Sequence, residues 1–325
     1  MLGVYSMSSA LFERGFHITK EDEPDKEMIS IIIPSLNEGH FLHRTLESIY
    51  SNTRTKFEVI IVDDASSDGS TEQVDWGNYP GLLFHRNSER HGVIRSRILG
   101  STFARGHYYV FMDAHCNPEP GWETALLEAS QRCQDRAITV PITPALDATT
   151  WKDHPHQFGK TMTFNHKLDM AWCDTRELDF DNSSWQSPIF AGSCFLVSRT
   201  FYEELEGLDN GLAFWGGENI DLSLRCWMIG GKVLVVKSAL VGHIYKSSFN
   251  YSLTNETIIS NKLRVAYVNF STRRFQRVLE GLGVTNKLAE EVVPYWPGAE
   301  RRRAYLMDNR RFDDEWYLEK FGIGL

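Results

Sequence analysis

The sequence predicts an α/β protein whose central, mostly parallel sheet is flanked by helices, and three observations support this fold class. Residues 28–33 form a β-branched apolar run that stops at Pro34, and residues 57–62 form a second run that stops at a pair of aspartates. Between them, residues 38–50 have helical spacing, which predicts a βαβ unit. Strands that are apolar on nearly every residue are buried on both faces, as in parallel sheets that helices cover on both sides.

The other elements follow from the same criteria. Residues 93–105 have helical spacing, and residues 108–112 fit a further buried strand. Residues 144–188 are rich in Trp, Asp, His and Thr and have weak periodicity, which favours a long covering loop or a lid. The second half of the chain continues, in order, with an apolar segment at 189–197, helices at 199–206 and 220–228, a strand at 232–240 and helical residues at 257–279.

The C-terminal tail has mixed charge, which predicts a helix or a hairpin. We expect Arg301, Arg302 and Arg303 to lie on a solvated helix face rather than to form a basic track for nucleic acid. The chain carries 34 Lys and Arg against 43 Asp and Glu, a net charge of −9. This acidic balance argues against nucleic acid as a partner, because a phosphate backbone would be repelled.

The composition also limits the compartment and the cysteine chemistry. No apolar run approaches the roughly 18 residues of a membrane span, and the first residues show no targeting segment. We therefore expect a soluble, cytoplasmic chain. The five cysteines include no Cys-x-x-Cys pair, which argues against a disulfide framework or a thiolate zinc site and favours free thiols.

Polar side chains follow three of the predicted strands. They are the turn of residues 34–38, the pair Asp63 and Asp64, and the segment from Asp113 to His115. Ligands of open α/β sheets bind at the carboxyl ends of the strands. We therefore expect these three clusters to converge on one site.

Asp113 and His115 form a candidate metal pair. They are two residues apart on an extended segment, so their side chains point to one side. A carboxylate oxygen with an imidazole nitrogen suits Mn²⁺ better than Mg²⁺ or Ca²⁺, and the oxygens of a bound diphosphate would complete the shell. The residues alone also allow Asp113 to cap the turn before Pro118, with His115 at the surface. His243 follows a buried strand and can be either a core histidine or a third ligand.

Two other groups of residues could contact a nucleotide. Asp63 or Asp64 can bind the hydroxyls of a ribose, although an Asx turn explains the pair nearly as well. Arg90 and Arg95 can meet phosphate oxygens, although such arginines more often lie on a solvated helix face. No Gly-x-Gly-x-x-Gly follows the first strand and no phosphate-loop motif occurs, which argues against a dinucleotide cofactor.

Trp215 precedes a glycine pair and Glu218. The glycines would let a loop open and close over a ligand, with Trp215 excluding water from the closed site. The same residues can also form an ordinary helix N-terminal turn that packs an aromatic ring. Both interpretations place Glu218 at the start of a helix.

Seven sequence blocks follow one another in the order SIIIPSLNEGHFLHRTLESI, FEVIIVDDASSDGS, RHGVIRSRILG, FMDAHCNPEPGWETALL, FAGSCFLVSRTFYEELEGLD, FWGGENIDLSLRCWMIGGKV and VGHIYKS. Over about residues 28–275 the chain resembles the catalytic domain of polypeptide N-acetylgalactosaminyltransferases. Its Asp-x-His, Trp-Gly-Gly-Glu-Asn and Val-Gly-His blocks are specific in combination. The resemblance implies the GT-A glycosyltransferase fold, a Rossmann-like sheet with flanking helices, and a transferase that uses a UDP-sugar and Mn²⁺ and retains the anomeric configuration.

The resemblance also implies roles for individual residues. Asp113, His115 and His243 match the metal ligands. Trp215 matches a tryptophan that swings over the donor, and Glu218 matches a glutamate near the sugar. The residues expected around the donor are Pro34, Asp63, Asp64, Arg90, Asp113, Gly192, Ser193, Trp215, Lys246 and Tyr251.

Three departures from the family pattern concern the donor site. Ser193 replaces the second glycine of a pair that contacts the sugar, and the family's threonine in the first motif is replaced around Pro34 and Ser35. Lys246 replaces an arginine, which keeps the charge but loses the bidentate fork. The sequence also shows no lectin domain or membrane anchor, and we expect a cytoplasmic, lectin-free relative.

These observations predict the division of the chain. Residues 1–27 form a charged lead-in, residues 28–280 the GT-A catalytic domain, and residues 281–325 a C-terminal helical extension. Within the catalytic domain, residues 28–115 form the nucleotide-binding half and residues 116–280 the sugar and acceptor half.

The predicted function is Mn²⁺-dependent transfer of a sugar, GalNAc or another hexose or N-acetylhexosamine, from a UDP-sugar to a hydroxyl acceptor with retention. A peptide Ser or Thr acceptor follows from the resemblance, and the aromatic region from Trp151 to Trp185 could line an acceptor groove. Two alternatives stay open. One is an inverting family-2-type enzyme with Asp221 or Glu218 as base on a glycan or lipid acceptor. The other is a non-catalytic scaffold that binds a UDP-sugar.

Overall fold

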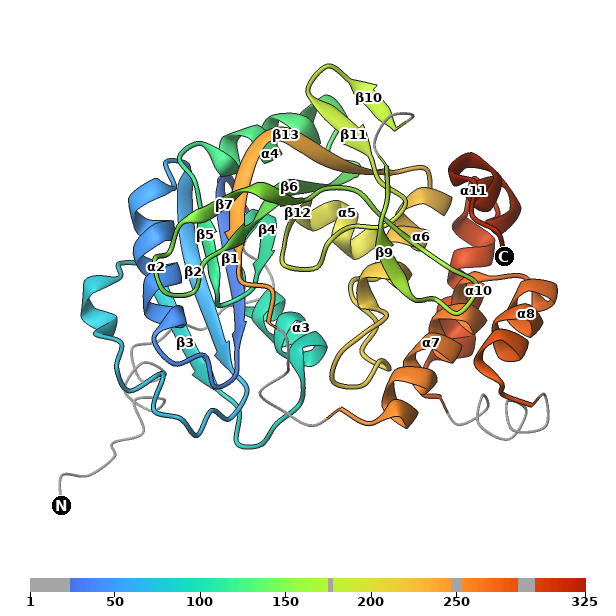
Figure 1. Ribbon diagram of the computed structural model, residues 1–325, viewed down its shortest axis with the longest axis horizontal. Helices are drawn as coiled ribbons and strands as arrows, with labels where there is room; N and C mark the ends of the chain where they lie inside the picture. The colour runs from blue at the N-terminus through green and yellow to red at the C-terminus, as the bar shows by residue number, and fades with distance from the viewer. Residues whose placement is uncertain (1–23, 175–177, 247–252, 286–295) are drawn as a thin grey trace.

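The framework of the computed structural model, which describes residues 24–174, 178–246, 253–285 and 296–325, is one large mixed sheet (Figure 1). Its strands are, in chain order, β1 (Asp25–Ser35), β2 (Lys56–Asp63), β3 (Leu82–Arg86), β4 (Gly106–Met112), β5 (Cys116–Pro118), β6 (Ala137–Leu146), β7 (Asp153–Gly159), β10 (Asp179–Asp181), β11 (Ser184–Gln186), β12 (Cys194–Ser198) and β13 (Lys232–His243). A separate two-stranded ribbon consists of β8 (Met162–Phe164) and β9 (Met170–Trp172).

Helices lie on both faces of this sheet, and the last helices of the chain group together near the C-terminus (Figure 1). They are α2 (Phe41–Asn52), α3 (Val93–Phe103), α4 (Trp122–Arg132), α5 (Arg199–Glu204), α6 (Glu218–Met228), α7 (Asn255–Asn269), α8 (Thr272–Leu282), α10 (Ala299–Asn309) and α11 (Asp314–Phe321), with a 3-10 turn η1 (Trp76–Asn78). Within the residues that the structure describes, no helix has both the length and the apolar character that crossing a membrane requires.

The strand order is β10-β11-β13-β6-β12-β4-β1-β2-β3. Strands β4, β1, β2 and β3 run parallel to one another, and β6 and β13 form a second parallel pair. Strand β12 lies between these groups and is antiparallel to both neighbours. The predicted, mostly parallel α/β sheet is therefore confirmed, with β12 and the β10–β11 edge as antiparallel additions.

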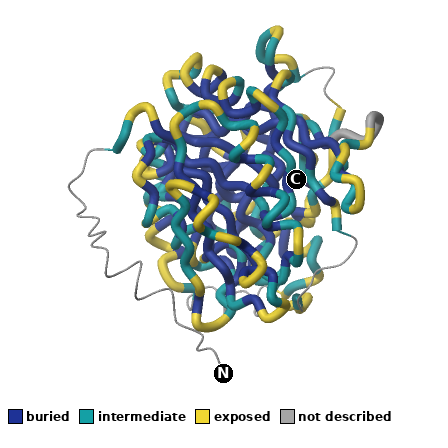
Figure 2. Tube along the Cα trace, turned by 90° about the vertical axis from the view of Figure 1, so that its left-hand side faces the viewer, coloured by how far each residue is buried: buried dark blue, intermediate teal, exposed yellow. Residues whose placement is uncertain are grey.

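Alternate side chains of the parallel strands enter two cores. In β1, Ile29, Ile31 and Ile33 pack with α2 and α4, whereas Ile32 packs on the opposite face with α3. All four side chains are fully buried, and Figure 2 shows the buried strands running through the interior. Burial on both faces is what nearly continuous apolar strands predict.

The predicted helices and strands are present with small shifts of their ends. Helices α2, α3, α5 and α6 and strands β1, β2, β4 and β13 occupy the predicted places. Residues 257–279 are helical, but in two helices, α7 and α8. The break occurs because Phe270 adopts an extended backbone and the N–H of Ser271 donates to a carboxylate oxygen of Asp314 at 2.8 Å.

The long covering loop predicted for residues 144–188 is wrong in form, because this segment consists largely of short paired strands. Strand β7 is antiparallel to β6, β8 pairs with β9, and the β10–β11 hairpin pairs with β13. Strands β6 and β13 are ten and twelve residues long. Strand β7 pairs with residues 143–146 of β6, and β11 pairs with residues 234–236 of β13.

The solvated face predicted for the three tail arginines is correct for Arg301 and wrong for the other two. The side chain of Arg301 is 66% exposed, whereas that of Arg302 is only 6% exposed. Arg303 donates to the carbonyl oxygens of Tyr267 and Phe270 at the end of α7. Carbonyls at a helix end lack partners within the helix, so Arg303 joins α10 to α7 by supplying them with donors.

Candidate functional site

A cavity of about 420 Å³ lies at the carboxyl ends of β1, β2 and β4. The turn after β1 contributes Glu38, the turn after β2 contributes Asp64, and the end of β4 contributes Asp113 and His115. The convergence predicted for the three polar clusters is therefore confirmed. The opposite wall comes from the loop that leads into α6, from His243 at the end of β13 and from residues 244–246 after it.

Asp113, His115 and His243 come together in this cavity. Each offers one ligand atom, and these atoms all lie within 4.8 Å of one another. The strand pairing explains the meeting, because His243 is in register with Cys116, the residue after His115. Nε2 of His243 lies 3.5 Å from Oδ2 of Asp113, and the two imidazole centroids are 5.0 Å apart.

The donor set of this triad fits a divalent metal. Within the described part of the chain, neither ring nitrogen of His243 makes a hydrogen bond, although both are buried. Burial lowers the pKa of His243, which favours the neutral imidazole that binds metals. Desolvation would raise the pKa of Asp113, but the charge of Arg97 and the neighbouring histidines hold it well below its usual range. One carboxylate with two imidazoles suits Mn²⁺.

Glu38 contacts the metal triad through His115. Its Oε2 lies 3.0 Å from Nδ1 of His115, and Nζ of Lys246 donates to both carboxylate oxygens at 2.7 and 2.8 Å. Desolvation opposes the charge of Glu38, but His115 and Lys246 outweigh it and lower the pKa. Because Nδ1 is engaged, Nε2 of His115 is the nitrogen left to bind a metal. Glu38 belongs to the first predicted polar cluster but was not among the predicted site residues.

Replacing Glu38 with glutamine is expected to weaken Mn²⁺ binding by about 10- to 100-fold, because the imidazole loses the charged partner that orients it. Calorimetric titration of Mn²⁺ without nucleotide measures this effect. Lys246→Met is the matched control, since it removes the other partner of Glu38 and leaves the contact with His115 in place. Equal losses in the two variants would contradict the role given to Glu38.

Arg97 of α3 joins the metal triad to the opposite wall. Its Nη2 donates to Oδ1 of Asp113 and to the carbonyl oxygen of Gly192, both at 2.7 Å. Its Nη1 lies 3.5 Å from Oε1 of Glu218. The Arg97 side chain is only 3% exposed, so its charge depends on these carboxylates for compensation.

Arg95 of this helix was among the candidate phosphate contacts, whereas Arg97 was not predicted. Arg95 is exposed, whereas Arg97 lies on the face of α3 that also buries Ile94 and Gly100. The spacing of three residues from Ile94 to Arg97 to Gly100 was a readable signal. A charged residue on the buried face of a helix needs a buried partner.

The loop before α6 carries Trp215 and the glycine pair. Gly216 and Gly217 have φ of 96° and 91°, a conformation that favours glycine. The N–H of Gly216 donates to Oε2 of Glu218 at 2.9 Å. Burial raises the pKa of Glu218, although the charge of Arg97 offsets part of the rise. Trp215 and Glu218 both line the cavity, and opening of the loop stays a prediction.

The adjacent aspartates Asp63 and Asp64 have different surroundings. Asp64 lines the cavity and accepts a hydrogen bond from the N–H of Gly92 at 2.7 Å. Asp63 is fully buried, accepts from the N–H of Ser66 at 3.1 Å and lies 3.3 Å from Nε of Arg86. The Asx-turn interpretation therefore describes Asp63, and Asp64 is the candidate for contact with a nucleotide.

Five further predicted donor residues also border this cavity. They are Pro34, Arg90, Gly192, Ser193 and Lys246. The guanidinium of Arg90 lies over the ring of Phe214 at 4.8 Å. Tyr251 lies outside the described residues.

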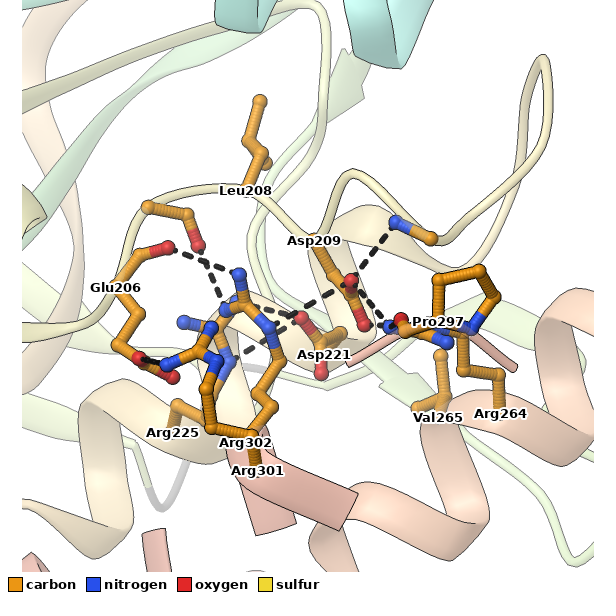
Figure 3. Close-up of polar contacts among 12 residues, drawn as sticks. Glu206, Leu208, Asp209, Asp221, Arg225, Arg264, Val265, Pro297, Arg301 and Arg302 are labelled. Atoms are coloured by element: carbon orange, nitrogen blue, oxygen red, sulfur yellow. Dashed lines mark hydrogen bonds and ion pairs between the residues drawn. The ribbon is translucent and has the colours of Figure 1, made fainter. Parts of the chain in front are cut away.

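The structure argues against Asp221 as a catalytic base. Asp221 lies in the first turn of α6 with 1% of its side chain exposed. Its Oδ2 accepts from Nη2 of Arg225 at 2.5 Å (Figure 3), and its Oδ1 accepts from Asn269 at 2.8 Å. A base must reach the proton that it removes, and both oxygens of Asp221 are already occupied inside the protein.

Comparison with protein families identifies two matching regions. Residues 30–206 match the model of glycosyl transferase family 2, and residues 175–248 match the N-terminal domain of galactosyltransferase.

Several curated relatives are polypeptide N-acetylgalactosaminyltransferases. Human enzyme 15 is 32% identical over 69% of this chain and 37% of its own length, and Xenopus tropicalis enzyme 11 is 32% identical over 75% and 43%. Inactive polypeptide N-acetylgalactosaminyltransferase-like protein 5 of Macaca fascicularis is 32% identical over 74% and 56%. The chain thus spans about two fifths to just over half of these relatives.

Two solved structures share the fold. The crystal structure of GalNAc-T7 with UDP, GalNAc and Mn²⁺ has a TM-score of 0.78 and 25% identity over 93% of this chain and 57% of that one. The crystal structure of S. aureus TarS 1-349 in complex with UDP-GlcNAc has a TM-score of 0.53 and 12% identity over 91% and 92%. The predicted GT-A fold is therefore confirmed.

Proposed function

We propose, because the chain belongs to glycosyl transferase family 2, that it transfers a sugar from a UDP-sugar to a hydroxyl acceptor in a Mn²⁺-dependent reaction. The observation that carries this proposal is the convergence of Asp113, His115 and His243 in the cavity at the carboxyl end of the sheet. The relative solved with UDP, GalNAc and Mn²⁺ supports the same donor class. The donor sugar is GalNAc or another hexose or N-acetylhexosamine.

The residues of the cavity have separate tasks in this reaction. Asp113, His115 and His243 would hold the metal, which when bound offsets the negative charge that develops on the diphosphate leaving group. Lys246 also lines the cavity and would add a second positive charge near the diphosphate. Arg97 and Glu218 lie 3.5 Å apart in the cavity lining and would orient the sugar from this one side.

We propose that the donor's anomeric configuration is retained. The acceptor oxygen bonds to the anomeric carbon on the face from which UDP leaves, and the acceptor's proton passes to the departing phosphate oxygen. This route needs no protein base. It is supported by the surroundings of the two candidate carboxylates, since Arg225 and Asn269 engage Asp221 and the N–H of Gly216 engages Glu218.

The stereochemistry can be measured directly. With an α-linked UDP-sugar, NMR of the early product is expected to show an α-linkage, because front-face attack preserves the configuration. A β-linked product would contradict the proposal.

An inverting reaction is the second candidate, and the raised pKa of Glu218 beside the cavity favours it. Glu218→Gln separates the two. If Glu218 is the base, the substitution abolishes transfer while Mn²⁺-dependent UDP binding persists. In the retaining reaction the same variant keeps partial transfer, because glutamine still accepts hydrogen bonds.

We propose a peptide Ser or Thr as acceptor, by similarity to the curated relatives. Trp172 and Tyr245 at the cavity support an acceptor surface, since they are 47% and 46% exposed and meet edge to face. Trp151, which was expected in the same groove, instead stacks on Phe41. A panel of Ser/Thr peptides beside oligosaccharides tests the acceptor, and transfer to the oligosaccharides alone would overturn this part.

A further inference from the structure

The loop of residues 213–217 forms part of the cavity wall in an uncommon backbone conformation. Phe214 has a φ of 51°, and Gly216 and Gly217 have φ of 96° and 91°. A residue with a side chain rarely adopts positive φ unless its surroundings hold it there. Phe214 bridges to Gly92 at the start of α3, where any added side-chain carbon would collide with the Phe214 backbone. The loop is thus held on its α3 side by close backbone contact.

Asn261 of α7 holds the loop from the other side. Its side chain is almost fully buried and uses both ends of its amide. Oδ1 accepts from the N–H of Ala213 at 2.8 Å. The two hydrogens of Nδ2 are shared among the carbonyl oxygens of Ala213, Trp215 and Gly216, which lie 2.8, 3.0 and 2.9 Å from the nitrogen. One side chain therefore satisfies the backbone before and after Trp215.

A buried ion network fixes α7 next to the start of this segment (Figure 3). Arg264, one turn after Asn261, donates to both carboxylate oxygens of Asp209 at 2.7 and 2.8 Å. It also donates to the carbonyl oxygen of Pro297 at 2.9 Å. Arg302 of α10 lies 3.5 Å from the same carboxylate. The tail thereby helps to set the position of the helix that carries Asn261.

We propose that Asn261 is a positioning residue that holds the 213–217 loop in the cavity wall and so keeps Trp215 and Glu218 at the donor site. The link to the donor rests on the proposed function, whereas the hold on the loop does not. Asn261 acts through the loop backbone. The loop presents one N–H and three carbonyl oxygens to the Asn261 side chain. An amide suits this position because it offers both an acceptor and a donor for these groups.

Hydrogen exchange of the full chain tests the hold directly. In Asn261→Ala, the amides of residues 213–217 are expected to exchange about tenfold faster or more, with little change in β1 and β4. The matched control is Asn269→Ala. Asn269 is also a buried asparagine of α7, but its amide donates to Asp221 and to the carbonyl oxygen of Val265. Loop exchange that stays at the wild-type rate in Asn261→Ala, or that rises equally in the control, would overturn the proposal.

Asn261→Asp provides a second test that keeps the size of the side chain. The carboxylate still accepts from Ala213 but places negative charge beside three carbonyl oxygens, so the loop is expected to loosen at least as much as in Asn261→Ala. An aspartate variant that melts like the wild type and shows wild-type loop exchange would refute the role of the amide nitrogen.

Kinetics then separate this proposal from the proposed function. A loosened loop is expected to raise the KM for the UDP-sugar by about tenfold, while Mn²⁺-dependent affinity for UDP alone changes little. If the loop loosens but KM for an active donor stays unchanged, the link to the donor is wrong. If no UDP-sugar reacts with the wild type, the proposed function fails. The hydrogen-exchange result still shows whether Asn261 restrains the 213–217 loop.

Discussion

Replacing Asp113 with alanine is expected to lower UDP-sugar turnover by about 10³-fold or more, because the change removes preorganised charge from the site of the leaving group. Asp113 is the carboxylate of the metal triad and also accepts from Arg97 at 2.7 Å. The variant therefore loses the anionic metal ligand and leaves a buried guanidinium with less compensation. UDP release measures the loss of turnover, and calorimetric titration with Mn²⁺ measures the loss of metal affinity.

Asp153→Ala is the control for this prediction. Asp153 lies beside Gly242 of β13, and burial raises its pKa to about 6, yet it is not among the residues that line the cavity. Its replacement is expected to preserve metal binding and most of the turnover. Unchanged Mn²⁺ affinity in Asp113→Ala would contradict the assignment of the metal site.

Arg97→Met is expected to lower the free energy of unfolding by about 3–5 kcal/mol near neutral pH, because it leaves two partly or fully buried carboxylates without their shared cation. Asp113 and Glu218 would then face each other across the space that the guanidinium fills. Turnover is expected to fall as well, since neither carboxylate keeps its orientation. Urea unfolding and UDP release measure these losses.

The loss of stability in Arg97→Met is expected to be smaller at pH 5 than at pH 7.5. Without Arg97, desolvation raises the pKa of Glu218 further, and the pKa of Asp113 loses its strongest lowering influence. A carboxyl with a raised folded-state pKa holds its proton longer when folded, so the free energy of unfolding falls as pH rises through that range. The variant therefore recovers part of its stability in acid.

Arg95→Met tests whether this effect belongs to the site. Arg95 is exposed on the same helix, two residues away, so its replacement is expected to change stability little at either pH. If the loss of unfolding free energy in Arg97→Met is independent of pH, or if Arg95→Met shows the same loss, the pairing of Arg97 with the two carboxylates is contradicted.

Local patterns predicted the strands and helices that build the sheet, because their periodicity is set by which faces are buried. The ends of β1, β2 and β4 also located the site, since the parallel topology brings strand ends together. Residues 144–188 could not be predicted in the same way. Strand β7 pairs with β6, and β11 pairs with β13, which lies far from it in sequence. Such pairing leaves little trace in local periodicity.

The candidate site was predicted in part for similar reasons. Asp113 and His115 are close in sequence, so their spacing predicted the pair. His243 joins them through the pairing of β13 with β5, which sequence spacing does not reveal. Asp221 could have been recognised as structural, because Arg225 follows it at a spacing of four residues on a helix. Arg302 gave no such signal, since its partners Glu206 and Asp209 lie more than 90 residues earlier.

The most direct test of the account is UDP release by the wild-type chain from a panel of UDP-sugars, with Mn²⁺ or with EDTA, beside calorimetry of UDP binding. Release of UDP from one sugar is expected to require Mn²⁺ and to disappear in Asp113→Ala. If no UDP-sugar of the panel releases UDP, and UDP binding does not depend on Mn²⁺, the protein is not a transferase. That result would favour a scaffold that lacks catalysis.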